Sequence, residues 1–193
     1  MIRVKTVPEP KEFDLKVRKK GNNWIKVNQG RTNYPSYWIE FRPILAEGFE
    51  NLCGYTAMWL PPYQGQVDHF IAQKDDSKQV YEWHNYRYIS PTINAAKKPS
   101  MTWLDPYKVQ DNWFELDLLT LELRLTDKIP DEIKTIAKKT LERLKLNGTA
   151  IIRQREAWYE MYQQGLPLEI LRHKAPLIAK AIDKEQDKTG AVK

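Results

Sequence analysis

The sequence predicts an α+β fold in which a small unit of two strands and a helix lies between N-terminal helices and a C-terminal helical region. Apolar residues recur at helical spacing towards both ends of the chain, whereas the middle holds short segments rich in β-forming residues. The chain has 193 residues, of which 41% are hydrophobic, and this is enough for one buried core. We therefore expect one domain with appended segments.

The N-terminal quarter of the chain predicts helices. Residues 8–20 predict a short helix that is entered through prolines and ends at Gly21. Residues 35–49 carry apolar side chains at helical spacing, which predicts a helix with one buried face. These side chains include Trp38, Phe41, Leu45 and Phe49. We assign residues 1–50 to an N-terminal arm and helix.

The middle of the chain predicts strands, a loop and a helix. Residues 53–60 are rich in β-formers and stop at a pair of prolines, and residues 66–71 resume a strand pattern, so we expect a hairpin. Asp68 and His69 would lie near the far end of its second strand. A unit of residues 51–100 is completed by a polar loop at 73–78, a segment at 80–88 and a helix at 91–98.

The last part of the chain, residues 101–193, predicts a β-hairpin and C-terminal helices packed as one domain with the middle unit. The hairpin is expected over residues 113–118 and 120–125. Helices are expected at residues 130–146, 149–164 and 168–182, and the charged residues from Asp183 onward are expected to fray.

The composition limits the classes of function. A single cysteine, Cys53, excludes a disulfide within the chain and a multi-cysteine zinc cage. The net charge of +6 suits a polyanionic partner. The N-terminus lacks the apolar core of a signal peptide, and no apolar run approaches the roughly 18 residues that span a bilayer. We therefore expect a cytoplasmic protein that does not contact a membrane.

Asp68, His69, Asn85 and Asn94 are side-chain types suited to hydrolysis of a phosphodiester. His69 suits the role of general base, because an imidazole with a pKa of about 6.5 is partly neutral at cellular pH. Asp68 and Asn94 offer hard oxygen ligands for Mg²⁺ or Mn²⁺. Asn85 would hold His69 in one orientation through the backbone. Adjacent residues on a strand point to opposite sides, so Asp68 and His69 can share a face only where the strand ends or twists.

Three short motifs hold these residues: Val67-Asp68-His69-Phe70, Tyr81-Glu82-Trp83-His84-Asn85-Tyr86-Arg87 and Asn94-Ala95-Ala96-Lys97. They resemble the motifs of the HNH, or ββα-metal, endonucleases, with His69, Asn85 and Asn94 at the namesake positions. The third position is Asn rather than His, as in the HNH domain of the CRISPR effector nuclease. Further segments resemble bacterial HNH proteins, some of which are nuclease partners of an ATPase in antiphage defence.

The resemblance implies a ββα-metal HNH core and a metal-dependent endonuclease that acts on DNA. His69 would be the general base, and Asp68 and Asn94 would be the metal ligands. RNA as the substrate stays open, as do an ATPase partner and the oligomeric state. The alternative function is a nucleic-acid-binding or assembly subunit that cuts nothing alone.

One departure from the pattern concerns zinc. Many HNH proteins of this type bind a structural zinc with two Cys-x-x-Cys pairs, but a zinc ion cannot be held by the residues at the corresponding positions here. Those residues are Cys53, Thr56, Ser90 and Ile93. We therefore expect Mg²⁺ or Mn²⁺ but no structural zinc. Apolar packing by Trp59, Trp83 and Tyr86 is expected to replace the zinc.

Basic residues near the motifs are candidate contacts to DNA phosphates. Arg87, Lys97 and Lys98 are close enough in sequence to reach a scissile strand. For the lysines, an equal alternative is that they complement the dipole at the end of the predicted helix. The two remaining histidines stay outside the candidate site: His84 is expected to pack or to contact a phosphate, and His173 to lie on a solvated helix.

Overall fold

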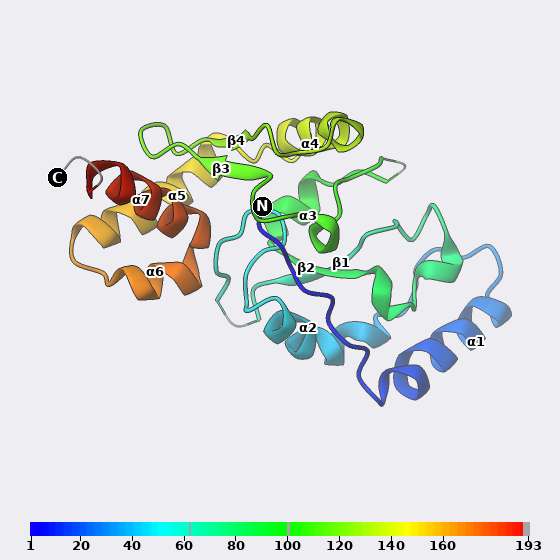
Figure 1. The fold of residues 1–193 in the computed structure, drawn as a ribbon. Coiled ribbons are helices and arrows are strands. Elements are labelled where there is room, and N and C mark those ends of the chain that lie inside the picture. Colours follow the sequence, from blue (N-terminus) through cyan, green and yellow to red (C-terminus); the bar gives the residue numbers. More distant parts are fainter. Residues whose placement is uncertain (62, 100, 191–193) are drawn as a thin grey trace.

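The structure is a computed structural model that describes residues 1–61, 63–99 and 101–190 (Figure 1). Helices at both ends of the chain flank short strands, which form a pair of two-stranded antiparallel sheets in these residues. The α+β class predicted from the sequence is therefore confirmed. Within the same residues, no helix has both the length and the apolar character needed to cross a membrane.

The middle of the chain contains strand, strand and helix in that order. Strand β1 (Gln66–His69) pairs with β2 (Tyr86–Ile89), and helix α3 (Pro91–Ala96) follows directly. In this register Asp68 lies opposite Arg87, and His69 lies opposite Tyr86. The Ser90 side chain caps α3 by accepting a hydrogen bond from the backbone N–H of Ile93 at 3.3 Å.

The predicted hairpin between residues 53–60 and 66–71 is wrong. Residues 53–60 instead form a tight loop, in which the N–H of Cys53 donates to the carbonyl of Met58 at 2.9 Å. Ala57 has a φ of 54°, which a continuous strand does not allow. In the described residues this segment contributes one isolated bridge, between Leu52 and Trp59.

The N-terminal helix is longer than the sequence predicts. A π-helical segment at Asp14–Lys19 runs without a break into α1 (Lys20–Val27), so the helix passes through Gly21 instead of ending there. A Cβ atom on Gly21 would lie 2.1 Å from a ring carbon of Tyr81, so this glycine serves close packing and not helix termination. A 3₁₀ turn at Tyr37–Phe41 then leads into α2 (Arg42–Gly48), within the range predicted for the second helix.

The C-terminal part of the chain contains the predicted hairpin, formed by β3 (Phe114–Leu116) and β4 (Leu123–Leu125). Helices α4 (Asp131–Arg143) and α5 (Thr149–Gln163) agree with prediction, but the single helix predicted at 168–182 is two helices, α6 (Leu168–Lys174) and α7 (Pro176–Gly190). Pro176 disfavours helical backbone at Ala175, whose φ and ψ are −147° and 63°. Helix α7 also continues beyond Asp183, where fraying was predicted, and Asp183 pairs with Arg172 at 2.6 Å.

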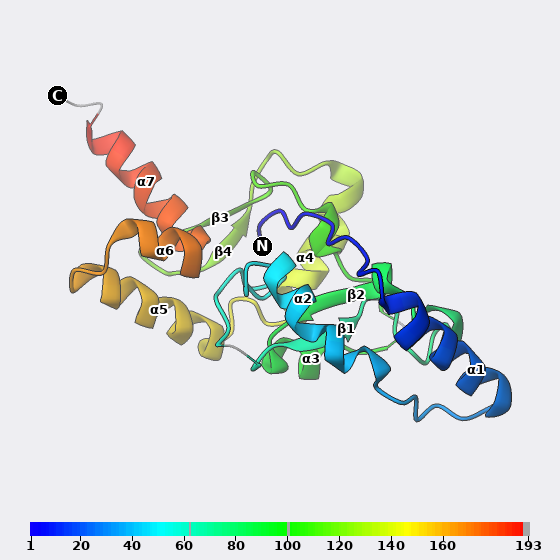
Figure 2. The same cartoon turned by 90° about the horizontal axis from the view of Figure 1, so that it is seen from below.

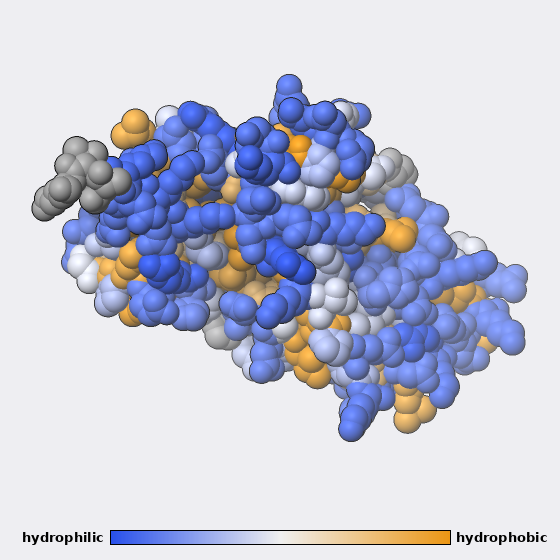
Figure 3. All heavy atoms as spheres, viewed as in Figure 1, coloured by the Kyte–Doolittle hydropathy of each residue, from blue (hydrophilic) through white to orange (hydrophobic). Residues whose placement is uncertain are grey.

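The buried apolar side chains of the described residues form two clusters that meet at β2. The N-terminal cluster joins Phe13 and Leu45 to Tyr86 and Tyr88 of β2. The C-terminal cluster joins Ile89 of β2 to α3 and to helices α4 to α7. Strand β2 is consequently buried on both faces, with α2 on one side and α3 on the other (Figures 1 and 2). The face seen in Figure 3 is mostly hydrophilic, with apolar atoms in small scattered groups.

Candidate functional site

His69 is the last residue of β1, and its ring has a defined hydrogen-bonding state. The ring Nε2 lies 2.9 Å from the backbone carbonyl oxygen of Val80. A carbonyl can only accept, so Nε2 carries the proton and Nδ1 keeps its lone pair, with Nε2 of Gln73 3.4 Å away. The ring packs edge-on against Trp38 and Tyr86, with centroid distances of 4.6 and 5.0 Å. His69 is therefore held in one orientation with Nδ1 as its basic nitrogen.

Burial also keeps the imidazole of His69 neutral. The pKa is lowered to about 4, chiefly by desolvation; the bond to Val80 opposes this shift, and the charge of Lys97 adds to it. At neutral pH the ring is therefore in the form that can take a proton.

Asn85 organises the loop between β1 and β2. Its Oδ1 accepts from the N–H of Ile71 at 2.7 Å, and its Nδ2 donates to the carbonyls of Ile71 and Gln79, each at 3.0 Å. These bonds connect Ile71, near the start of the loop, to Gln79, the residue before Val80. Asn85 is 2% exposed and acts on His69 only through this backbone.

Tyr86 contributes to the same arrangement and was not identified as a site residue from the sequence. Its hydroxyl donates to the carbonyl of Val80 at 2.9 Å, so that one oxygen accepts from both Tyr86 and His69. Tyr86 was expected only to pack. The register that places it opposite His69 is a property of strand pairing, which the local sequence pattern does not reveal.

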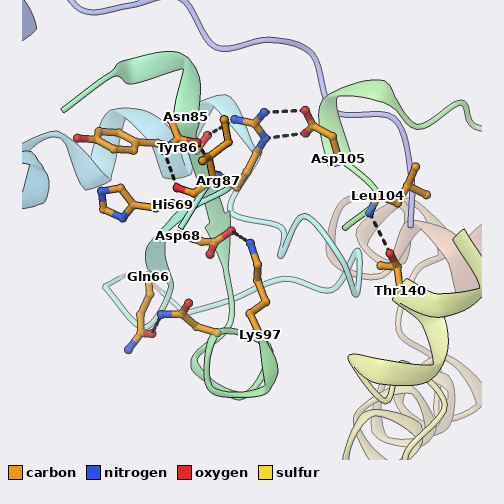
Figure 4. Close-up of polar contacts among 12 residues, drawn as sticks. Gln66, Asp68, His69, Asn85, Tyr86, Arg87, Lys97, Leu104, Asp105 and Thr140 are labelled. Atoms are coloured by element: carbon orange, nitrogen blue, oxygen red, sulfur yellow. Dashed lines mark hydrogen bonds and ion pairs between the residues drawn. The ribbon is translucent and has the colours of Figure 1, made fainter. Parts of the chain in front are cut away.

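Asp68 and Lys97 form a buried ion pair, with 2.5 Å between Oδ2 of Asp68 and Nζ of Lys97. Figure 4 shows Lys97 extending from the end of α3 towards Asp68 on β1. The side chains are 5% and 8% exposed, respectively. Burial raises the pKa of Asp68, and the charge and hydrogen bond of Lys97 oppose that rise. The pKa of Lys97 is lowered, again mainly by burial and against the effect of Asp68.

Asn94 lies on α3, three residues before Lys97. Its Nδ2 donates to Oε1 of Gln66 at 2.8 Å, which leaves Oδ1 as the acceptor side of the amide. Residues three apart lie on the same face of a helix, so Asn94 and Lys97 face β1 together. Gln66 is two residues before Asp68 and lies on the same face of that strand.

A cavity of about 340 Å³ brings these residues together. Asp68 and His69 both line it although they are consecutive residues of β1. The other polar residues in its lining are Gln73, Lys74, Asp75, Asn94, Lys97 and Lys98. Lys74 and Lys98 are exposed, and Lys74 is a candidate that sequence reasoning missed because it lies in a loop with no recognised motif. A larger hollow of about 440 Å³ between β3 and α7 contains none of the predicted residues.

Arg87 does not belong to this cavity, which corrects the predicted phosphate contact. Its guanidinium makes two hydrogen bonds of 2.7 Å to the carboxylate of Asp105, as Figure 4 shows. It also lies 3.9 Å from the ring centroid of Tyr107, and the residue is 4% exposed. Every face of the group is occupied by protein. Arg87 therefore joins β2 to the segment around Asp105 and has no access to a ligand.

The donor atoms fit a weakly held oxygen-seeking ion better than a tightly caged one. Asp68 and Asn94 supply oxygen atoms, but no cluster of three or more His, Cys, Asp or Glu side chains suited to a metal occurs among the described residues. Mg²⁺ and Mn²⁺ are commonly held by one or two protein oxygens, with water and phosphate in the other positions. Lys97 already neutralises one oxygen of Asp68, so any ion must compete with it.

The positions that correspond to zinc ligands in the resemblance are buried. Cys53 and Ser90 are brought together, since the N–H of Ser90 donates to Sγ of Cys53 at 3.3 Å. Tyr55, Met58, Ile89 and Ile93 are buried around them. Trp83 and Tyr86, which were expected to pack here, belong to the N-terminal cluster beside Phe13, and Trp59 instead lies under the ammonium group of Lys174.

The other two histidines lie outside the cavity. His84 is exposed and contacts Oε1 of Gln79 at 3.0 Å, and His173 is 68% exposed beside Glu169 on α6. His69 is therefore the histidine that can serve as a base here. Comparisons with protein-family models, with curated proteins and with solved structures find no significant match to this chain.

Proposed function

We propose that this protein is a metal-dependent endonuclease of the HNH type that hydrolyses phosphodiester bonds in DNA. The observation that carries the proposal is the ring of His69, which is protonated at Nε2, keeps Nδ1 as its basic nitrogen and lines the cavity that also holds Asp68 and Asn94. Asp68 and His69 lie on β1 and Asn94 lies on α3, and the order of β1, β2 and α3 is consistent with the ββα-metal arrangement.

His69 would act as the general base. Its Nδ1 takes a proton from a water molecule while the oxygen of that water bonds to phosphorus and the bond to the leaving sugar oxygen breaks. A divalent ion, when bound through Asp68 and Asn94, would stabilise negative charge on the phosphate and on the leaving oxygen. Because an approaching phosphate favours the imidazolium form, substrate binding raises the pKa of His69 towards the working pH.

Lys74 and Lys98 would hold the nucleic acid. They lie on different walls of the cavity, one in the loop after β1 and one just beyond α3. Ammonium groups are compact charges that bind phosphate without reading bases. The net charge of +6 would favour such contacts further. The proposal therefore includes binding that depends little on sequence.

The alternative is a binding or assembly subunit that retains this fold without cutting. It is favoured by one observation: Lys97 pairs with Asp68, the only carboxylate among the proposed metal ligands. If that pair is permanent, no ion binds and the cavity holds a phosphate at most.

Cleavage assays on plasmid DNA distinguish the two functions. The purified protein is incubated with supercoiled plasmid, and in parallel with RNA, under Mg²⁺, Mn²⁺ or a chelator. A nuclease nicks or linearises DNA only with the metal, and His69→Ala abolishes this while His84→Ala, a change at an exposed histidine outside the cavity, does not. Binding without cleavage under every metal condition would favour the subunit; equal cleavage by wild type and His69→Ala would reject His69 as the base.

A further inference from the structure

We infer that Lys97 occupies the place of the divalent cation and that metal binding displaces it from Asp68 towards the substrate phosphate. The inference rests on the proposed function, because it assigns Asp68 to the metal. It adds a competition between an internal cation and the metal at the same carboxylate.

The surroundings of the Lys97 ammonium group form a cation site. Nζ lies 2.5 Å from Oδ2 of Asp68. The ring centroids of Phe70 and Tyr55 lie 5.6 and 5.8 Å from the same atom, within the range in which aromatic faces attract a cation. The Asn94 amide is one helical turn away and faces the same strand. A metal held by Asp68 and Asn94 would therefore lie next to the ammonium group.

Charge balance shows why both cations are not held together. Two ion pairs lie close to one another here, Asp68 with Lys97 and Asp105 with Arg87, and each of the four side chains is less than a tenth exposed. Their charges cancel. A divalent ion would add two positive charges to this buried group, and like charges at such distances repel strongly where water is excluded. Arg87 is fixed by two hydrogen bonds to Asp105, so Lys97 is the cation that can move.

Lys97 has a path out of the site. It caps α3 with extended backbone, at φ −68° and ψ 134°, and it lines the open cavity together with Lys98. Rotation of its four-carbon side chain moves the ammonium group from Asp68 to the part of the cavity where a phosphate would lie. Lys97 would then be an internal counter-ion in the metal-free protein and a phosphate ligand in the metal-bound protein.

Binding of Mn²⁺ in the absence of DNA tests the competition. Electron paramagnetic resonance reports free Mn²⁺ during titration of wild type, Lys97→Met, Lys98→Met and Asp68→Asn. We expect Lys97→Met to bind at least about tenfold more tightly than wild type, because removal of the ammonium group ends both the competition and the repulsion. Lys98→Met removes the same charge from an exposed neighbour and should change affinity less than about threefold. Asp68→Asn should lose the site.

Labelling of lysines in the wild-type protein gives a second test that does not depend on whether a variant folds. An amine-reactive acetylating reagent should modify Lys97 slowly without metal and several-fold faster at saturating Mn²⁺ or Mg²⁺, with exposed Lys98 as the internal standard read by mass spectrometry. Unchanged Lys97 labelling on metal saturation, or equal Mn²⁺ affinity of wild type and Lys97→Met, overturns the displacement while leaving an Asp68-dependent metal site intact. Absence of any Asp68-dependent Mn²⁺ binding overturns both the displacement and the metal site.

Discussion

The backbone carbonyl of Val80 decides which nitrogen of His69 can act as a base. It accepts from Nε2 of His69 and from the hydroxyl of Tyr86, so the proton of the neutral ring stays on Nε2 and Nδ1 keeps its lone pair. The sequence identifies His69 as a candidate from its residue type and neighbours. It does not identify the nitrogen, because the partner lies eleven residues later in a loop whose path depends on Asn85.

Substitution of His69 should remove activity and leave DNA binding largely in place. We expect His69→Ala to lower the cleavage rate at least about 10²-fold, the low end for loss of a general base. Plasmid nicking rates and gel-shift affinities measure the two effects separately. A parallel fall in affinity and rate would mean that His69 serves binding.

The pH dependence of stability should also report on His69. Its pKa is about 4 in the folded protein, below the unfolded value of about 6.5. The contribution of the neutral ring to the free energy of unfolding is therefore complete above pH 6.5 and is lost as the pH falls towards 4. The loss of folding free energy attributable to this group is on the order of 3 kcal/mol. Urea unfolding at several pH values should show a steeper acid loss for wild type than for His69→Gln, in which this group no longer titrates. Parallel curves would show that the ring is not held neutral by burial.

Lys98 and Arg87 were both predicted to contact phosphate, but their substitution should change different properties: DNA affinity for Lys98 and the stability of the fold for Arg87. Lys98→Ala should weaken binding to all DNA sequences alike and reduce the salt dependence of binding by about one ion. Arg87→Met should instead destabilise the fold by about 3–5 kcal/mol, because it leaves the buried carboxylate of Asp105 unpaired. Salt-dependent DNA titration and thermal unfolding of both variants separate the two roles; a stable Arg87→Met protein with weaker DNA binding would restore Arg87 to the site.

At the scale of elements, the side chain of Asn85 bridges two parts of the loop between β1 and β2. Asn85 makes three hydrogen bonds to backbone groups of Ile71 and Gln79, and these bonds position the next residue, Val80. Asn85→Ala leaves buried backbone groups without partners, so we expect a loss of about 1–3 kcal/mol together with slower cleavage. Thermal unfolding and nicking assays measure both, with Asn22→Ala on the exposed side of α1 as the matched control.

The pairing of strands marks the limit of prediction from sequence. The types and order of the candidate residues, the second hairpin and most helices follow from local patterns. The partner of β1 does not, because residues 53–60 carry β-forming residues but bend at Ala57, and the true partner lies beyond a long loop. The burial of Arg87 and the pair between Lys97 and Asp68 also escaped prediction, since each depends on a residue brought near only by folding.

At the scale of the molecule, the C-terminal helices belong to the core that supports the site. Ile151 of α5 and Leu171 of α6 are 3% and 0% exposed, and they share a buried cluster with Ile93 of α3. The sequence leaves an ATPase partner open, but most apolar side chains of these helices are used within the fold, although Ile170 is 43% exposed. We expect a chain that ends before Thr149 to lose cooperative unfolding, measured by circular dichroism on heating. If the truncated chain melts cooperatively, the core does not need the C-terminal helices, and their surface would be available to a partner.

Because β2 lies between the two clusters, we expect the site to unfold only when the whole protein unfolds. No layer of solvent separates Tyr86, Tyr88 or Ile89 from the clusters on either side, so the strand cannot detach while either cluster persists. Its amide protons should exchange with deuterium only through complete unfolding, among the slowest in the chain. His69, the last residue of β1, pairs with this strand opposite Tyr86, so local unfolding of β2 would not open and close the site. Turnover would instead depend on movement at the rim, in the loop after β1 and the segment beyond α3, while its base stays fixed.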